Sequence, residues 1–486
     1  TLSNTTVSFA AGYTAAATAS AADALTLNLS GVTIGDNTTV SAATNTVETV
    51  NIASLIATNT LNDLQTTLAG TTTINISGDQ NLTVNTAFDN EVVTVNAATA
   101  EGDLNIQTGT GDVTVTLGTG DDVLVAQNGD NNLSGGAGDD AITSGTGDDT
   151  ITGGEGADTI IGGTGADDID AGAGDDLVQF AATADLAAAT VAGGDDADTV
   201  EITTDGEDVA DADLAGVTGV ETLSLADTDG AGDDVVVVLG ANASTAGISS
   251  IVVGATAAAG DFTSIDSEVV AALTVDATDM GATDDESLVL TNTGTADVTQ
   301  TAFTVTGADG TVDASGTTAA VSITFVDDTD NNASSAVTGT GSTTIAGVTG
   351  ANVDTITIDA DNVTEAVSTL TVSGAANVTI ASGGTELVAN LVATDLTGDL
   401  DVTTGDAAGD AQSIAVGTGN VTLQGGAATD TITITGTTGD VTVDLSASSS
   451  IVSLTAGEGD QTITTSGQAD TIVSGAGADT IVGTTG

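Results

Sequence analysis

Carboxylates recur at a fixed interval between residues 117 and 179, where the sequence divides into seven consecutive segments of nine residues. In order, they read LGTGDDVLV, AQNGDNNLS, GGAGDDAIT, SGTGDDTIT, GGEGADTII, GGTGADDID and AGAGDDLVQ. The sixth position is Asp in every segment but the second, which has Asn, and the eighth is always Leu, Ile or Val. Glycine allows backbone turns that expose carbonyl oxygens, and Ca²⁺ binds about six to eight carbonyl and carboxylate oxygens, whereas Mg²⁺ rarely occupies such all-protein cages. The repeat therefore predicts calcium sites.

The charge of the chain also requires cations. It contains 70 Asp and Glu residues and no Lys, Arg or His, so its formal net charge is −70. Two carboxylates at the spacing of neighbouring strands, about 4.8 Å, repel by roughly 3.5 kcal/mol at an effective dielectric constant of about 20. A domain is stable by only about 5–15 kcal/mol, so a few stacked pairs would unfold it. Because no basic side chain is present, inorganic cations must neutralise these carboxylates, and we expect the chain to fold only with them.

The composition excludes several classes of function. Without His, Cys, Lys or Arg the chain has no catalytic triad, no zinc motif and no cationic clamp. One Tyr and no Trp leave few sugar contacts for a carboxylate pair that could hydrolyse glycosides, so we expect no enzyme. Phosphate binding needs Lys or Arg, so we expect no nucleic-acid partner. No apolar run approaches the roughly 20 residues that span a bilayer, so we expect no membrane insertion.

A period of nine residues fits a six-residue turn followed by a three-residue strand whose central side chain points inward. Outside the repeats, segments such as GDLNI (102–106), GDVTV (111–115) and GDLDV (398–402) keep the strand but lose the acidic position. Such short alternating segments between Gly, Asp and Asn predict strands, and sequential parallel rungs would stack into a β-solenoid with a narrow core of Val, Ile and Leu. The fold class is thus all-β, a parallel β-solenoid, with a β-sandwich left open for residues 205–345.

The nonapeptides resemble the RTX (repeats-in-toxin) calcium β-roll, whose repeat is G-G-x-G-x-D-x-U-x. The resemblance implies that two nonapeptides form one turn of a parallel roll, and that turns two repeats apart share each ion on the same edge. About five ions are then expected between 117 and 179, the Asn131/Asp149 site being the weakest. Second- and fourth-position carbonyls would join the sixth-position side chain, with first- and third-position carbonyls from the partner turn. The implied ligands are Asp122, Asn131, Asp140, Asp149, Asp158, Asp167, Asp176, Gly118, Gly120, Gly136, Gly138, Gly145, Gly147, Gly154, Gly156, Gly163, Gly165, Gly172 and Gly174.

Weaker copies of the repeat lie outside this run. Near the C-terminus, Asp430, Asp470 and Asp479 occupy the ligand position, whereas AGEGDQTIT has Gln461 there. The segment GGDDADTVE (193–201) is an isolated relative with Asp198, and one copy does not complete a shared site, so a ligand and a structural turn are both open. We expect four regions: an N-terminal β-solenoid (1–107), an RTX β-roll (108–180), a middle β-rich region, solenoid or sandwich (181–424), and a C-terminal RTX-like β-roll (425–486).

A second resemblance concerns the chain as a whole. The segments NTVETVNIAS (45–54) and TGVETLSLAD (218–227), with the Thr-, Ala-, Gly- and Asp-rich strands around them, resemble the surface-layer (S-layer) proteins of Gram-negative bacteria. This implies a location outside the cell or at its surface, type I secretion as for RTX proteins, and a lattice or filament built from copies of the chain, with a cell-surface anchor as a further partner. The alternative is an RTX-type adhesin, or a segment that binds ice or another surface through a regular outward row of Thr.

Overall fold

The computed structural model of the chain describes many separate segments. They are residues 24–30, 33–34, 48–61, 71–204, 207–225, 235–253, 262–267, 272–276, 287–291, 302–308, 311–316, 320–325, 334–339, 343–346, 355–359, 370–374, 377–381, 390–397, 399–403, 411–424, 431–435, 438–444, 446, 451–455, 457–465 and 471–483. The chain forms two compact units. The first comprises Thr1–Thr203, Ala212–Leu223 and Thr245–Gly247, and the second Thr204–Asp211, Ser224–Ser244 and Ile248–Gly486.

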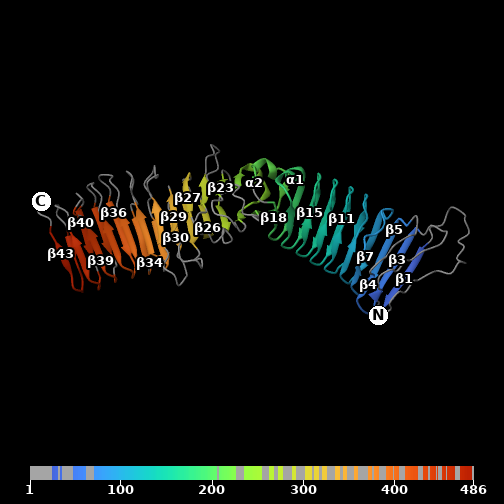
Figure 1. Ribbon diagram of the computed structural model, residues 1–486, viewed down its shortest axis with the longest axis horizontal. Helices are drawn as coiled ribbons and strands as arrows, with labels where there is room; N and C mark the ends of the chain where they lie inside the picture. Colours follow the sequence, from blue (N-terminus) through green and yellow to red (C-terminus); the bar gives the residue numbers. More distant parts are fainter. Residues whose placement is uncertain are drawn as a thin grey trace, which may run out of the picture. The chain divides into compact units, whose positions relative to one another are not determined.

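The first unit is a stack of parallel strands that alternate along the chain between two sheets (Figure 1). One sheet contains β1 (Ala24–Ser30), β3 (Thr49–Leu55), β5 (Thr73–Gly78), β7 (Thr94–Ala100), β9 (Thr114–Thr116), β11 (Asn132–Ala137), β13 (Thr150–Glu155), β15 (Asp168–Ala173), β17 (Thr190–Asp195) and β19 (Val217–Thr218). The other contains β2 (Thr33–Ile34), β4 (Asn59–Leu61), β6 (Leu82–Val84), β8 (Leu104–Gln107), β10 (Val123–Val125), β12 (Ala141–Thr143), β14 (Thr159–Ile161), β16 (Leu177–Phe180) and β18 (Thr199–Ile202). The predicted parallel β-solenoid is therefore confirmed.

The register of the strands sets one turn of the solenoid at two nonapeptides. Val123 of β10 pairs with Ala141 of β12, and Ala141 pairs with Thr159 of β14, so the offset is eighteen residues. In the other sheet, Asn132 of β11 pairs with Thr150 of β13 at the same offset. Equal positions of every second repeat therefore stack directly on one another.

The eighth position of each repeat forms the core, as the sequence predicts. These residues come in two facing stacks, one from each sheet, and none is more than 1% exposed: Leu124, Leu133, Ile142, Ile151, Ile160, Ile169 and Val178. Burying a side chain of this size contributes about 1.5–3 kcal/mol, so the narrow core gains one such increment per strand.

The predicted division into six-residue turns and three-residue strands holds for only one of the two sheets. The strands β10, β12 and β14 have three residues each. In the other sheet β11, β13 and β15 have six, because parallel pairing continues into the next repeat, with Gly136 opposite Gly154 and Ala137 opposite Glu155. The turns that follow these longer strands are correspondingly short.

The second unit repeats the architecture. One sheet contains β21 (Val235–Leu239), β23 (Phe262–Ser267), β25 (Ser287–Thr291), β27 (Thr311–Gly316), β29 (Ser334–Gly339), β31 (Thr355–Asp359), β33 (Asn377–Ala381), β35 (Leu400–Thr403), β37 (Val421–Gln424), β39 (Val441–Asp444), β41 (Gln461–Thr464) and β43 (Thr480–Val482). The other contains β22 (Ser250–Val253), β24 (Ala272–Asp276), β26 (Ala302–Ala308), β28 (Ala320–Phe325), β30 (Thr343–Ala346), β32 (Leu370–Gly374), β34 (Asn390–Leu396), β36 (Ala411–Val416), β38 (Thr431–Thr435), β40 (Ile451–Thr455) and β42 (Thr471–Val473).

Within the second unit, each strand pairs in parallel with the next strand but one along the chain. The pairs from β21–β23 to β29–β31 follow this rule. The described strands between 235 and 346 thus continue a solenoid, and the β-sandwich alternative does not describe them. The boundaries of the four predicted regions stay a prediction. The predicted N-terminal solenoid (1–107) and the predicted β-roll (108–180) both belong to the first unit.

Helical structure in the described part of the chain is short. It consists of α1 (Thr183–Ala188), a 3₁₀ turn at Asp211–Leu214 and α2 (Ala241–Ala246). The strand β20 (Thr222–Leu225) lies between the 3₁₀ turn and α2. Among the described residues, no helix has the length and apolar character to cross a membrane. The helix α1 replaces the turn that would follow Phe180, so it interrupts the eighteen-residue period.

Candidate calcium sites

The sixth-position carboxylates form a continuous hydrogen-bonded ladder on one edge of the roll. We call this the first edge, formed by the turns that end in Asp122, Asp140, Asp158 and Asp176. The backbone N–H of Asp122 donates to Oδ1 of Asp140 (2.8 Å), and that of Asp140 donates to Oδ1 of Asp158 (2.8 Å). The N–H of Asp158 donates in the same way to Oδ1 of Asp176 (2.7 Å). Each carboxylate is therefore held in place by the previous turn.

The opposite, second edge carries the alternate repeats in the same arrangement. The backbone N–H of Asn131 donates to Oδ1 of Asp149 (2.8 Å), and that of Asp149 donates to Oδ1 of Asp167 (3.0 Å). The expected stacking of both sets is confirmed. On this edge the ladder ends at Asp167, because the residue in register with it in the next turn is Ala189, directly after α1.

One carboxylate oxygen of nearly every ladder residue is left without a protein partner. The sixth-position side chains between 122 and 198 are each at most 3% exposed. Their Oδ1 atoms accept the ladder hydrogen bonds, whereas the buried Oδ2 atoms have no hydrogen-bond partner among the described residues in Asp140, Asp149, Asp158, Asp167, Asp176 and Asp198. Leaving a buried charged oxygen unsatisfied is costly, so these atoms define the place where a cation is needed.

Burial shifts the pKa of the same groups. It raises the pKa of Asp140 and Asp176 to about 7, against the opposing effect of the ladder N–H groups and with a further contribution from neighbouring carboxylates. Burial likewise raises the pKa of Asp122, Asp158 and Asp167 to about 6. A group with this behaviour must either bind a proton or have its charge neutralised by a cation.

Backbone carbonyls of the next turn face the free carboxylate oxygens. A Cβ atom placed on Gly135 would lie 2.7 Å from the carbonyl oxygen of Gly153 and closer still to Oδ2 of Asp140, so both oxygens face one point. At Gly153 the carbonyl oxygen of Ala171 and Oδ2 of Asp158 stand in the same relation. In the described residues no three acidic side chains converge on one point. Each site combines one ladder carboxylate with carbonyl oxygens. The carbonyls of Gly153 and Ala171 are first-position carbonyls of the partner turn, in agreement with the prediction.

The amide of Asn131 shows where the carbonyls converge. Its Nδ2 donates to the carbonyl oxygens of Gly129 (3.0 Å), Ser144 (3.3 Å) and Gln127 (3.5 Å). In repeat numbering these are the fourth and second positions of its own repeat and the first position of the next turn, which are three of the four carbonyls that the RTX resemblance implies for calcium. A donor thus stands where the other turns present only oxygens. Because hard oxygen ligands of this kind suit Ca²⁺, the residues present fit that ion.

The second- and fourth-position glycines give the carbonyls their direction. From Gly136 to Gly174 these glycines all have positive φ, for example +133° at Gly154 and +124° at Gly156. The first repeat departs from the pattern, because Gly118 and Gly120 lack positive φ. There the Oδ2 of Asp122 accepts a long hydrogen bond from the N–H of Gly118 (3.4 Å). The assignment of these residues as ligands stays a prediction.

On the second edge, side chains of the chain itself contact the carbonyls. The hydroxyl of Ser144, which is fully buried, donates to the carbonyl oxygen of Gly162, and Asn131 contacts three carbonyls as described above. Asp167 has no carboxylate in register with it in the next turn, where Ala189 follows α1. The first edge therefore presents the more complete set of oxygens.

A second, outer ladder runs along both edges and was not predicted. It is formed by the exposed fifth-position Asp residues, and its hydrogen bonds run in the opposite direction to those of the inner ladder. On the first edge, the N–H of Asp139 donates to Oδ1 of Asp121 (3.0 Å), and the N–H of Ala157 donates to Oδ1 of Asp139 (2.9 Å). On the second edge, the N–H of Asp148 donates to Oδ1 of Asp130 (3.0 Å). The repeated Gly-Asp pair, also present in GDLNI and GDVTV, is the signal that could have shown it.

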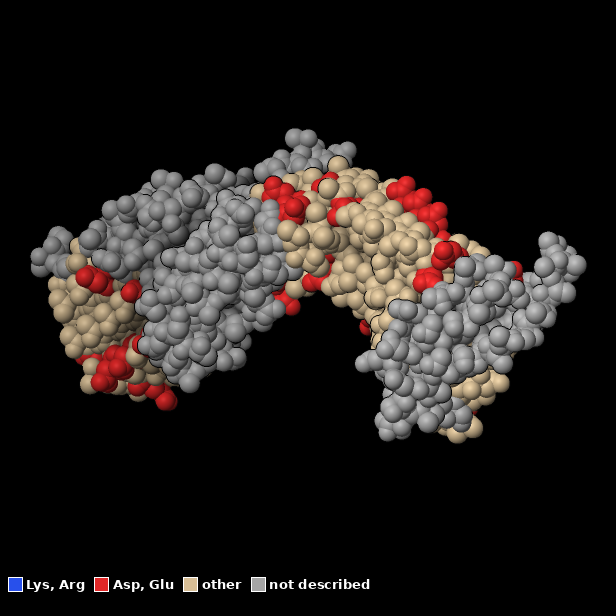
Figure 2. Space-filling view, turned by 45° about the vertical axis from the view of Figure 1, so that its right-hand side comes forward, with Lys and Arg blue, Asp and Glu red and all other residues tan. Residues whose placement is uncertain are grey.

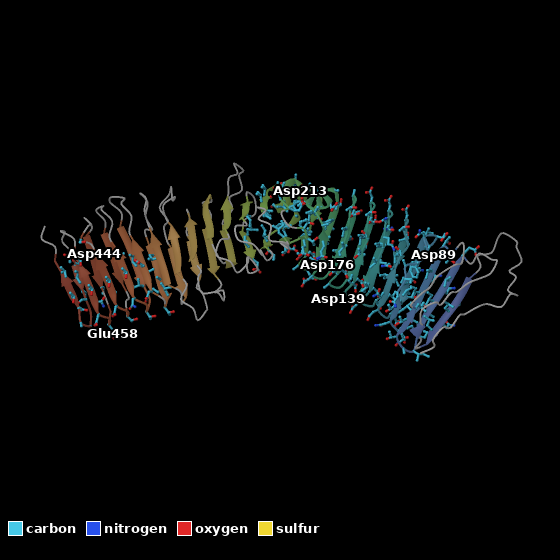
Figure 3. The ribbon with its side chains drawn as sticks, in the orientation of Figure 1. Asp89, Asp139, Asp176, Asp213, Asp444 and Glu458 are labelled. Atoms are coloured by element: carbon cyan, nitrogen blue, oxygen red, sulfur yellow. The ribbon has the colours of Figure 1, made fainter. Side chains whose placement is uncertain are left out.

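The outer ladder also continues where the inner carboxylates are absent. In the second unit, Asp440 accepts from the N–H of Asp460 (2.8 Å), while Leu400, Val421 and Val441 are buried at the sixth position. Apolar side chains thus take the place of the carboxylate in these turns. Figure 2 shows acidic side chains gathered in runs on the described surface with no basic residue among them, and Figure 3 marks Asp139 of the outer ladder and Asp176 of the inner one.

The weaker predicted sites differ from one another. Asp430 and Asp470 lie outside the described residues. Asp479 is half-buried, and its Oδ1 accepts the N–H of Gln461 (3.1 Å), while Nε2 of Gln461 donates to the carbonyl oxygen of Gly459 (2.6 Å). Asp198 is not isolated, since its Oδ1 accepts the N–H of Asp176 (2.9 Å) and so extends the first-edge ladder.

Stacked turns of a parallel β-solenoid, with carboxylates and carbonyls facing one another along each edge, define a calcium-binding β-roll. Comparison with protein families gives the same result. The model of the RTX calcium-binding nonapeptide repeat (four copies) matches residues 105–133, 116–151, 143–178, 406–433 and 455–486. Residues 105–178, 406–433 and 455–486 therefore carry RTX calcium-binding nonapeptide repeats, and the first of these segments forms a β-roll. Comparison with curated proteins found no match.

Proposed function

We propose that this chain is an exported structural protein that folds on binding Ca²⁺ outside the cell and then assembles with copies of itself into a surface layer or filament. The observation that supports this most strongly is the inner ladder, whose buried Oδ2 atoms have no protein partner in a chain without a single basic side chain. RTX repeats are typical of secreted calcium-binding proteins, which supports export.

The energy of ion binding is sufficient to control folding. With free Ca²⁺ at about ten times the dissociation constant, each site adds about 1.4 kcal/mol to stability. About five sites then add roughly 7 kcal/mol, which is comparable with the whole stability of a domain, about 5–15 kcal/mol. Because free Ca²⁺ is low in the cytosol and high outside, folding would be favoured only after export.

Assembly is supported by the outer ladders. Exposed carboxylates such as Asp121 and Asp139 on one edge, and Asp130 and Asp148 on the other, form rows of like charge. Rows of this kind repel one another in the absence of cations, and divalent ions can bridge them between two molecules. The role we propose is non-catalytic, because the chain has no His, Cys, Lys or Arg for a catalytic triad or a cationic clamp and few aromatic residues to bind a sugar beside a carboxylate pair.

The test compares the purified chain in millimolar Ca²⁺, in EDTA, and in Mg²⁺ at matched ionic strength. Circular dichroism should show β-structure only with Ca²⁺, and light scattering with electron microscopy should show ordered assemblies under the same condition. A chain that keeps its β-structure in EDTA overturns the calcium-dependent fold. A chain that folds with Ca²⁺ but stays monomeric overturns assembly and favours the adhesin alternative.

A further inference from the structure

The first-edge ladder continues beyond the run of seven nonapeptides, through the separate copy GGDDADTVE (193–201), to a residue outside the repeats. The strand β18 pairs with β16, with Thr199 opposite Leu177, so Asp198 lies in register with Asp176 although twenty-two residues separate them. The backbone N–H of Asp198 donates in turn to Oε2 of Glu221 (2.9 Å). Glu221 therefore takes the place in the ladder that the next sixth-position Asp takes in the repeats.

The carboxylate of Asp198 faces the same kind of oxygen pair as the repeat carboxylates do. Asp198 is 1% exposed, and its Oδ2 has no hydrogen-bond partner among the described residues. A Cβ atom placed on Gly193 would collide with this Oδ2 and with the carbonyl oxygen of Gly219. The corresponding pair at Gly135 is Oδ2 of Asp140 and the carbonyl oxygen of Gly153.

The backbone around Asp198 keeps the conformation of a nonapeptide despite its different sequence. Gly194, at the second position, has φ +126°, and Asp196, at the fourth, has φ +78°. Asp196 and Ile56 are the two non-glycine residues with positive φ in the described part of the chain. An L-residue rarely adopts this conformation, so its retention at the fourth position indicates that the direction of the carbonyl there matters.

The electrostatic surroundings favour a cation. Asp198 is buried, and the negative charges of Glu221, Asp175 and Asp196 lie near its carboxylate. The sequence offers no basic side chain to offset these charges. The arrangement is therefore that of a repeat site in which a Glu from the segment Val217–Leu225 replaces the partner turn.

We propose that Asp198, the carbonyl oxygen of Gly219 and the carboxylate of Glu221 bind one further Ca²⁺, which closes the array on the first edge. This inference rests on the proposed calcium-dependent fold. Glu221 supplies the second negative charge, and the Asp198 N–H orients its carboxylate by the 2.9 Å hydrogen bond. The site lies outside residues 105–178, the part of the roll that the repeat model matches.

The experiment counts Ca²⁺ bound to the full chain by equilibrium dialysis. The variants are Glu221→Gln, whose amide oxygen can still accept the Asp198 N–H, and Asp198→Asn. The matched control is Glu91→Gln, which removes one charge from an exposed residue outside the nonapeptide repeats. We expect each of the first two variants to bind one ion fewer than the wild type, or to bind the last ion at least about tenfold more weakly, and the control to match the wild type.

The outcomes separate the two proposals. If the wild type binds Ca²⁺ and both test variants bind as many ions with unchanged affinity, the site at Glu221 is wrong and the calcium-dependent fold stands. If the wild type itself binds no Ca²⁺, the proposed function fails. Circular dichroism in Ca²⁺ checks that the variants fold. Should Glu221→Gln not fold, Asp198→Asn decides, because an Asn at this position can donate to carbonyl oxygens as Asn131 does.

Discussion

The backbone N–H of Asp140 donates a 2.8 Å hydrogen bond to Oδ1 of Asp158, which lies eighteen residues later and one turn further along the roll. This bond fixes one oxygen of the Asp158 carboxylate and leaves the other, Oδ2, buried without a partner. Orientation of the ligand is thus a property of the backbone stack, whereas neutralisation of its charge requires a cation. The two requirements can be separated by substitution.

Replacement of Asp158 by Asn should have effects of opposite sign with and without calcium. In EDTA the variant should be more stable than the wild type, because the amide removes a buried charge and can donate to carbonyls as Asn131 does. In Ca²⁺ it should be less stable by about 1.4 kcal/mol for each site lost at ten times the dissociation constant. Thermal unfolding followed by circular dichroism in both buffers measures this.

The matched control for this substitution is Asp139→Asn, which removes the same charge from the exposed outer ladder and keeps an oxygen to accept the N–H of Ala157. It should change stability in Ca²⁺ little, since substitutions at exposed positions usually change stability by no more than about 0.5 kcal/mol. Equal losses for the two variants in Ca²⁺ would contradict a special role of the inner ladder.

Replacement of Asn131 by Asp should create an ion-binding turn on the second edge. The donor that now contacts Gly129 and Ser144 would become an acceptor, so the three carbonyls would need a cation. We expect one more bound Ca²⁺, higher stability in Ca²⁺ and lower stability in EDTA. Asn132→Asp, at the neighbouring exposed position, is the control and should leave the ion count unchanged. An unchanged count for Asn131→Asp would contradict the creation of a new site at this turn.

The stability of the cation-free roll should fall as pH rises. The pKa values of Asp140 and Asp176 are about 7 and those of Asp122, Asp158 and Asp167 about 6 in the folded chain, against an ordinary value of 3.8. Between pH 3.8 and about 7 the folded state therefore binds more protons than the unfolded chain. The stabilisation of the fold by these bound protons is complete below about pH 4 and is lost as pH rises through 6 to 7. Urea unfolding in EDTA across this range measures it.

Calcium should reverse this dependence. Protons compete with Ca²⁺ for the same carboxylates, so affinity should weaken as pH falls below about 7, and binding at pH 6 should release protons. Titration calorimetry in buffers of different ionisation enthalpy detects the released protons. A roll that in EDTA is more stable at pH 8 than at pH 5 would show that the ladder carboxylates stay charged in the absence of a cation.

The sequence predicts the features that recur with a constant period and misses those that do not. The inward position of Ile142 and Ile160 and the stacking of Asp140 on Asp158 follow from the nine-residue repeat, because two repeats make one turn. The link between Asp198 and Glu221 does not, since twenty-three residues, including the 3₁₀ turn Asp211–Leu214, separate them and the closing residue is Glu. The donor role of Asn131 was also beyond prediction, because residue type alone does not tell which end of an amide faces the carbonyls.

Gly156, the fourth-position glycine of its repeat, should be required for the full stability of the roll. At Gly156, φ is +124°, and a Cβ would lie 2.6 Å from the carbonyl carbon of Gly138 in the previous turn. Gly156→Ala should therefore destabilise the roll by about 1–3 kcal/mol and weaken Ca²⁺ binding, because the strained backbone turns its carbonyl away. Urea unfolding in Ca²⁺ gives the first quantity and equilibrium dialysis the second. Glu155→Ala, one residue earlier and exposed, should change neither. A Gly156→Ala variant with wild-type stability and affinity would mean that the direction of this carbonyl does not determine the site.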